Sequence, residues 1–184
     1  MIHHISIAAK EPSRVAEVLA ELWGGYSFPF PPVPGSYIAM PGDTLGTAIE
    51  VTPLGGELVP GADGEEVQSR RNETPSPYTA THAAVSVPTS EARIKEVAAR
   101  EGWRAETFER GGVFRLVELW VENRLLLELL TPAMQRDYLD FMTPEKYAGL
   151  FGFDYAPRGG EVGDFDPAGA GVPLMRRRGC EAFW

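Results

Sequence analysis

The chain has 184 residues, 43% of them hydrophobic, and a formal net charge of −9; this size suits one domain or two half-sized modules that share a core. The negative charge argues against a nucleic-acid partner, because such binding requires a basic face. No apolar run approaches the roughly 18 residues of a membrane-spanning helix, and the first residues lack the pattern of a secretory signal. Cys180 is the single cysteine, which excludes an intrachain disulfide and fits a reducing compartment, so we expect a cytoplasmic protein with no membrane partner.

The first part of the chain predicts a strand, a helix and further strands. Residues 1–9 alternate apolar and polar positions, which is typical of a half-buried strand. Pro12 suits the first turn of a helix, and Gly24 suits its left-handed end. The helix has one apolar stripe, formed by Val15, Val18, Leu19, Leu22 and Trp23. The proline-rich residues 29–35 predict an edge or a loop. Two strands follow, at 36–40 and 47–52.

The second half of the chain repeats this pattern. His82 stands at the start of a strand as His4 does, and Glu128 stands on the last strand as Glu50 does, with the same 46-residue spacing from 4 to 50 and from 82 to 128. A helix capped by Thr89 or Ser90 separates them; its buried stripe is Ile94, Val97 and Ala98, and it ends at Gly102. Three strands are expected after it, at 103–109, 114–121 and 124–130, with tight turns at Gly111-Gly112 and Glu122-Asn123.

The remaining segments do not repeat. Residues 55–80 are rich in Gly, Glu, Ser, Asn and Pro, as in a long connection. After the repeat, residues 133–142 are expected to be helical, and Thr143 and Pro144 to open a second short helix. Residues 149–184 look irregular but carry many aromatic side chains, so we expect them to pack on their own sheet, over a pocket or against another chain. The expected division is 1–54, 55–80, 81–132 and 133–184.

Glu50 is expected on the face of its strand that points away from the helix. Ile49 and Val51 share the face that a helix must cover, so Glu50 looks to the opposite side of the sheet. Imidazole and carboxylate are ligands for borderline divalent ions such as Zn, Ni, Co or Mn. A shared ion between the two His–Glu pairs is one hypothesis, and a cup that uses these groups without metal is the other.

Residues 2–132 resemble the vicinal oxygen chelate superfamily, which includes glyoxalase I, bleomycin-resistance proteins, fosfomycin-resistance enzymes and extradiol dioxygenases. The resemblance rests on two βαβββ modules, each of which begins with a histidine and closes on a glutamate before a proline. It implies an α+β fold in which two tandem βαβββ modules form an open, cup-shaped mixed sheet, followed here by a C-terminal extension. It also implies metal ligands at His4, Glu50, His82 and Glu128, a set similar to that of bacterial glyoxalase I.

The resemblance implies a metal-dependent lyase or isomerase of glyoxalase type, acting on a small carbonyl or α-hydroxy carbonyl compound. The ion would be Zn, Ni, Co, Mn or Fe, and Glu50 or Glu128 would serve as the catalytic base. The alternatives are a metal-free binding protein of the bleomycin-resistance kind and a metal-dependent dioxygenase. Many family members build the cup across a homodimer, which we also expect here.

Other polar and aromatic positions are expected to have no catalytic role. His3 points to the other face of its strand and is interpreted as structural. Tyr37, Trp103 and Arg115 are interpreted as core or surface residues. Glu118 and Glu122 are expected to be solvated.

Overall fold

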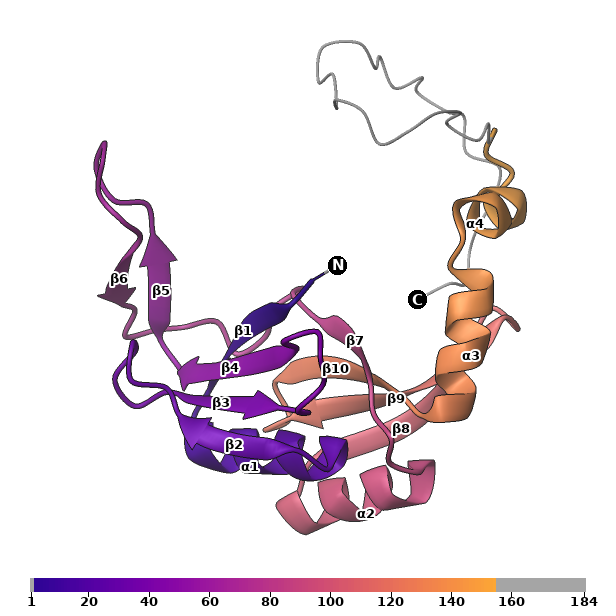
Figure 1. Ribbon diagram of the computed structural model, residues 1–184, viewed down its shortest axis with the longest axis horizontal. Coiled ribbons are helices and arrows are strands. Elements are labelled where there is room, and N and C mark those ends of the chain that lie inside the picture. Colours follow the sequence, from indigo (N-terminus) through magenta and orange to yellow (C-terminus); the bar gives the residue numbers. More distant parts are fainter. Residues whose placement is uncertain (1, 155–184) are drawn as a thin grey trace.

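The computed structural model describes residues 2–154, and this part of the chain contains two modules with the same element order. The first consists of β1 (His4–Ala9), α1 (Pro12–Trp23), β2 (Tyr26–Pro29), β3 (Tyr37–Met40) and β4 (Ala48–Pro53). The second consists of β7 (Ala83–Ser86), α2 (Glu91–Glu101), β8 (Arg104–Arg110), β9 (Phe114–Val121) and β10 (Leu125–Leu130). The α+β fold with tandem βαβββ modules is therefore confirmed (Figure 1).

The eight strands of the modules lie in two four-stranded mixed sheets with equivalent orders, β1-β4-β3-β2 and β7-β10-β9-β8. In each sheet the first and last strands of the module are parallel neighbours, and the other pairs are antiparallel. Ser6 is opposite Glu50 in the first sheet, and Ala84 is opposite Glu128 in the second. This topology places each predicted histidine strand beside its glutamate strand.

The helices begin and end as the sequence predicts. The apolar stripe of α1 is buried, and so are Ile94, Val97 and Ala98 of α2. The Ser90 side chain accepts a hydrogen bond from the backbone N–H of Arg93, so Ser90 is the cap of α2. Gly24 and Gly102 end the two helices in the left-handed conformation, with φ of 64° and 70°.

The two modules contact each other through α1 and α2, which lie together on one side of the sheets (Figure 1). Glu21 of α1 forms ion pairs with Arg93 and Arg100 of α2, and Arg14 of α1 binds Glu101 of α2. The hydrogen bond from Arg100 holds the pKa of Glu21 below its ordinary value, and the one from Arg14 does the same for Glu101. The stabilisation of the module contact by these carboxylates is therefore fully present at a pH above their ordinary pKa. It is lost as the pH falls through their lowered pKa and they become protonated.

Glu122, which the sequence suggested to be solvated, is half-buried and makes a structural contact. It lies in the β9–β10 turn with φ of 50°, followed by Asn123 with φ of 55°, which confirms the tight turn. Its carboxylate accepts hydrogen bonds from the backbone N–H groups of Lys10 (2.7 Å) and Glu11 (2.8 Å), immediately before α1. A carboxylate at a helix N-terminus satisfies free N–H groups and complements the helix dipole. Glu122 therefore fixes the turn of the second module to the first module.

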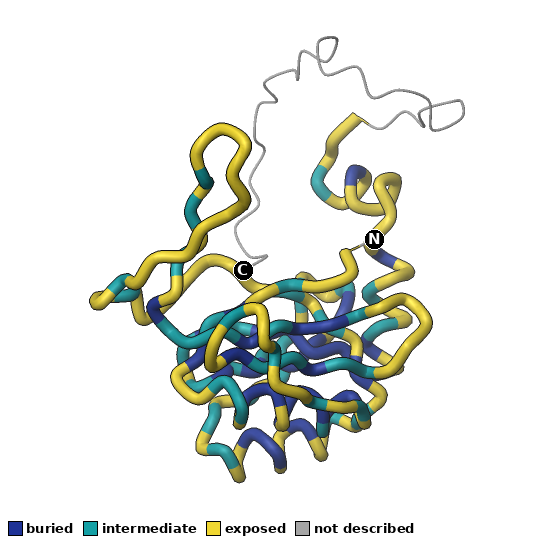
Figure 2. The backbone as a smooth tube through the Cα atoms, turned by 60° about the vertical axis from the view of Figure 1, so that its left-hand side comes forward, coloured by how far each residue is buried: buried dark blue, intermediate teal, exposed yellow. Residues whose placement is uncertain are grey.

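The connection between the modules contains a β-hairpin, which the sequence did not predict. Strands β5 (Gly56–Val59) and β6 (Gln68–Arg71) form a two-stranded sheet, with Glu57 and Arg70 paired at 2.8 Å. The hairpin projects from the rest of the fold and is exposed over most of its length (Figure 2). Because both of its faces meet solvent, its sequence lacks the apolar alternation by which strands are predicted.

Two short helices follow the second module, α3 (Pro132–Phe141) and α4 (Pro144–Phe151). The predicted cap at Thr143 is confirmed, because its side chain accepts a hydrogen bond from the N–H of Lys146. α3 packs on β9 through Phe114, whose ring is 5.2 Å from that of Tyr138. Helix α4 extends into the stretch expected to be irregular. The predicted packing of the tail concerns mainly positions beyond residue 154, outside the described residues, as is Cys180.

No helix in residues 2–154 is long and apolar enough to cross a membrane.

Candidate functional site

The first predicted pair is brought together by neighbouring strands. His4 begins β1 and Glu50 lies in the middle of β4, and their Nε2 and Oε1 atoms are 3.9 Å apart. The second carboxylate oxygen of Glu50 accepts a hydrogen bond from the Ser6 hydroxyl at 2.5 Å. Ser6 thus holds one oxygen of the carboxylate, and the other oxygen faces the imidazole.

The second predicted pair has the same arrangement in the other sheet. His82 directly precedes β7, and its Nε2 lies 4.0 Å from Oε2 of Glu128 on β10. Glu128 is the more enclosed of the two glutamates, with 10% of its side chain exposed against 18% for Glu50. The repeat in the sequence therefore corresponds to a repeat in side-chain placement.

Arg110, at the end of β8, is a second polar residue, in addition to Ser6, that sequence reasoning missed. Its Nη2 donates to Oε1 of Glu118 and to Oε1 of Glu128, both at 2.8 Å, and only 12% of its side chain is exposed. Burial alone would lower the pKa of Arg110, but the hydrogen bonds to the two glutamates raise it above its ordinary value. The guanidinium is therefore a fixed positive charge beside Glu128.

The expectation that Glu118 is solvated is thus wrong. Glu118 of β9 lies directly opposite Glu128 of β10 in the sheet register, and 16% of its side chain is exposed. Two like charges opposite each other in a sheet repel, so a cation is needed between them. The register of β9 and β10 could have shown that these two carboxylates need a cation, but that register depends on knowing which strands pair.

The two His–Glu pairs have the same arrangement, but the glutamates accept hydrogen bonds from different donors. In each half, one carboxylate oxygen is held by a neighbouring donor and the other faces an imidazole. The donor is a neutral hydroxyl, Ser6, for Glu50, and a guanidinium, Arg110, for Glu128. Hydrogen bonding of the outer oxygen orients a carboxylate toward a cation on the inner side, as is common around metal ligands.

The donor types fit a divalent ion, but one chain does not gather a full set. Within residues 2–154 no three His, Cys, Asp or Glu side chains come close enough together to hold an ion. The structure brings His4 to Glu50 and His82 to Glu128, but it does not bring the two pairs together within residues 2–154. A structural zinc site takes four ligands and a catalytic one three, so each pair is half of the predicted set.

The residues expected to lack a catalytic role have structural contacts. His3 Nδ1 lies 2.7 Å from the carbonyl oxygen of Leu45, a contact outside both pairs. Tyr37 and Trp103 pack against the hydrophobic core. Arg115 is exposed.

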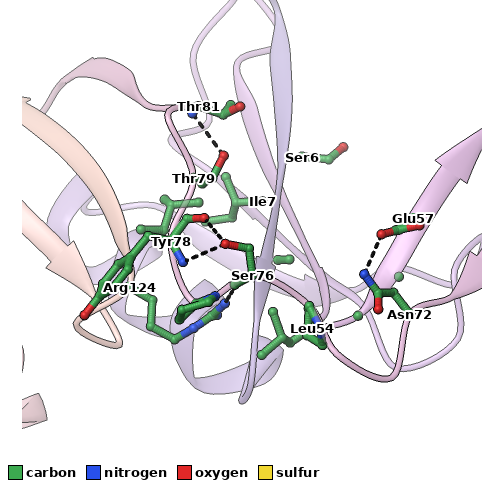
Figure 3. A pocket seen from close by; sticks show the side chains of 16 residues that line it. Ser6, Ile7, Leu54, Glu57, Asn72, Ser76, Tyr78, Thr79, Thr81 and Arg124 are labelled. Carbon is green, nitrogen blue, oxygen red and sulfur yellow. Dashed lines mark hydrogen bonds between the residues drawn. The ribbon is translucent and has the colours of Figure 1, made fainter.

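A cavity of about 390 Å³ lies beside β1. It lies between β1, the start of β5, the segment before β7 and the β9–β10 turn (Figure 3). Ser6, the residue that holds Glu50, lines it. The cavity is therefore continuous with the support of the first His–Glu pair.

No protein-family model matches the chain, and no curated protein matches it. Among solved structures, it is similar to the fosfomycin resistance protein FosX from Mesorhizobium loti, with 11% identity, a TM-score of 0.45, and coverage of 76% of this chain and 97% of that one. It is similar to glyoxalase I of Leishmania major, with 13% identity, a TM-score of 0.42, and coverage of 80% and 98%. A FosX variant of Listeria monocytogenes, complexed with Mn(II) and a dihydroxypropylphosphonic acid, matches with 16% identity, a TM-score of 0.41, and coverage of 75% and 97%. At such low identities and TM-scores, these similarities do not indicate what this chain binds.

Proposed function

We propose that the protein is a metal-dependent lyase or isomerase of glyoxalase type, which acts on a small carbonyl or α-hydroxy carbonyl compound. The observation that supports this most is the repeated pair, with histidine and glutamate 3.9 Å apart in one module and 4.0 Å apart in the other. Each glutamate lies on the last strand of its module, and each histidine lies at or directly before the first strand, which pairs with the last strand in parallel. A chance pair would have no reason to recur at the equivalent place with the same orientation.

The proposed ligands are His4 and Glu50 from one module and His82 and Glu128 from the other. Imidazole and carboxylate suit Zn, Ni, Co, Mn or Fe. When bound, such an ion would polarise a carbonyl oxygen and make the adjacent carbon more acidic. The remaining chemistry would belong to the chain, with Glu50 or Glu128 accepting a proton from that carbon.

We infer that two copies of the chain complete the site as a homodimer. Each copy offers two half-sites of two ligands, and one copy does not assemble three within residues 2–154. In the described sheets, β1 and β7 are end strands, each with one neighbouring strand. An end strand has unpaired backbone groups that can contact a second chain. A symmetric pair of chains could unite the first module of one with the second module of its partner.

The test is ion-dependent exchange of a carbon-bound proton with solvent. Protein treated with chelator and then loaded with each divalent ion is incubated in D2O with α-hydroxy carbonyl compounds, including hydroxyacetone and lactaldehyde. We expect NMR to show deuterium at the carbon beside the carbonyl with at least one ion, and no exchange in the chelated protein. Exchange that is equally slow with and without every ion would contradict the proposal.

A metal-free binding protein of the bleomycin-resistance kind is the second candidate, and one observation favours it. Arg110 already provides a positive charge to Glu128 and Glu118, so the second half-site has a cation of its own. A protein of this class would bind its ligand without any dependence on added ions, which the exchange experiment and metal analysis distinguish from the enzyme.

A further inference from the structure

The cavity beside β1 has the dimensions of a small-ligand site. Its volume of about 390 Å³ falls within the range of roughly 300–1,000 Å³ that such sites occupy. Hydroxyl-bearing side chains line it beside aliphatic ones; they are Ser6, Ser76, Tyr78, Thr79 and Thr81. Figure 3 shows Ser76, Tyr78 and Arg124 grouped on one side of the cavity and Glu57 and Asn72 on the other.

Among the described residues, two charged side chains line this cavity, and they differ in their partners. The carboxylate of Glu57 already has a counter-ion, because it accepts a hydrogen bond from the Arg70 guanidinium at 2.8 Å; it also accepts one from the Asn72 amide at 2.6 Å. Arg124 has no carboxylate within 4.0 Å among residues 2–154. Its Nη2 donates to a neutral acceptor, the carbonyl oxygen of Ser76, at 3.0 Å. The cavity therefore has a positive charge without a counter-ion.

An arginine without a carboxylate partner is uncommon in this chain. In the described residues, every arginine except Arg124 and Arg136 has a carboxylate oxygen within 4.0 Å. Arg136 is exposed on α3 and donates to the carbonyl oxygen of Pro132 at 2.9 Å. Arg124 is half-buried and lines a cavity. The two arginines therefore both lack a carboxylate partner but differ in burial and location.

The fold holds Arg124 in place. The preceding turn is attached to α1 by Glu122, as described above, and to the start of β8 by Asn123. Asn123 accepts a hydrogen bond from the N–H of Arg104 at 2.8 Å and donates one to the carbonyl oxygen of Gly102 at 2.9 Å. A guanidinium whose backbone is fixed binds an anion at a smaller entropic cost.

We propose that this cavity binds a small organic anion, with Arg124 contacting its carboxylate or phosphate group. Guanidinium groups suit both anions because two parallel N–H donors can face two oxygens. The hydroxyl groups around Arg124 are neutral donors and acceptors that suit a hydroxylated ligand. Ser6 connects the cavity to Glu50, so the remainder of the anchored molecule would lie next to the first His–Glu pair. The inference that this anion is the substrate of the enzyme rests on the proposed function. Anion binding at Arg124 does not rest on it.

The experiment uses the full chain free of metal, with the side-chain Nε–Hε resonances of its arginines observed by NMR. Inorganic phosphate and lactate are added in separate titrations, and glycerol is the neutral control. We expect both anions to shift the Arg124 resonance in a saturable manner, with a Kd below about 10 mM. Arg136 should shift in neither titration beyond the effect of equal ionic strength from sodium chloride.

Two substitutions complete the test. Arg124→Met should remove saturable binding, and Arg124→Lys should weaken it by about tenfold, because lysine keeps the charge without the paired donors. Arg136→Met should leave it unchanged. The proposal is overturned if Arg124 and Arg136 respond alike, if neither anion saturates Arg124, or if Arg124→Met binds as well as the wild-type protein. Since the protein is metal-free, these outcomes do not depend on the ion-dependent exchange that tests the proposed function.

Discussion

Glutamine in place of Glu50 or Glu128 is expected to lower solvent exchange of the substrate proton by about 10²- to 10⁴-fold in one of the two variants, the usual range for loss of a general base. Glutamine keeps an oxygen that can contact an ion but cannot accept the proton. The two glutamates are equivalent in the repeat, yet Ser6 holds one and Arg110 holds the other. We therefore expect only one of the two glutamates to act as the catalytic base.

The measurement is the D2O exchange assay on Glu50→Gln and Glu128→Gln, together with metal content. Glu106→Gln is the matched control, because Glu106 is an exposed glutamate of β8 opposite Glu118; it should exchange at the wild-type rate. The affected variant should retain its ion and lose exchange. If both variants bind metal and turn over at the normal rate, neither glutamate is the base and the glyoxalase-type function is excluded.

Replacing Arg110 with methionine is expected to reduce the free energy of unfolding by about 3 kcal/mol, at the lower end of the range for breaking a buried ion pair. Methionine fills similar space but leaves Glu118 and Glu128 facing each other without a cation, with 16% and 10% of their side chains exposed. Their repulsion and their desolvation then both oppose folding.

Urea unfolding measures this effect, with Arg115→Met as the control. Arg115 is 56% exposed and lies 3.5 Å from Glu91, so its loss should change stability by less than about 0.5 kcal/mol. Adding Glu118→Gln to Arg110→Met should recover part of the loss, because one of the two repelling charges is removed. An Arg110→Met protein as stable as Arg115→Met would show that the guanidinium does not hold the second half-site.

The sequence predicted what depends on local pattern and on the repeat. The apolar stripe of α1, a cap at Thr89 or Ser90 and the turn at Glu122-Asn123 each follow from a few neighbouring residues. The structure confirms them, with Ser90 as the cap. The pairing of His4 with Glu50 and of His82 with Glu128 could be predicted because both halves carry the same spacing.

The contacts that were missed join residues far apart in the chain. Glu122 binds the backbone immediately before a helix of the other module, more than a hundred positions away, and nothing near it in sequence indicates that partner. Arg110 meets Glu118 and Glu128 only after β8, β9 and β10 are in register. The exposed β5–β6 hairpin lacks the apolar alternation that predicts strands. The two half-sites stay separate within residues 2–154 of one chain, so the four-ligand site stays a prediction.

Native mass spectrometry of protein purified without chelator tests the central claim most directly, because it counts chains and ions together. We expect a homodimer that carries about one divalent ion per chain. His4→Ala combined with His82→Ala should yield a dimer without ions. A wild-type protein that takes up no divalent ion, even after incubation with Zn, Ni, Co, Mn and Fe, would contradict the metal-dependent account, as would a double variant that retains the full complement of ions.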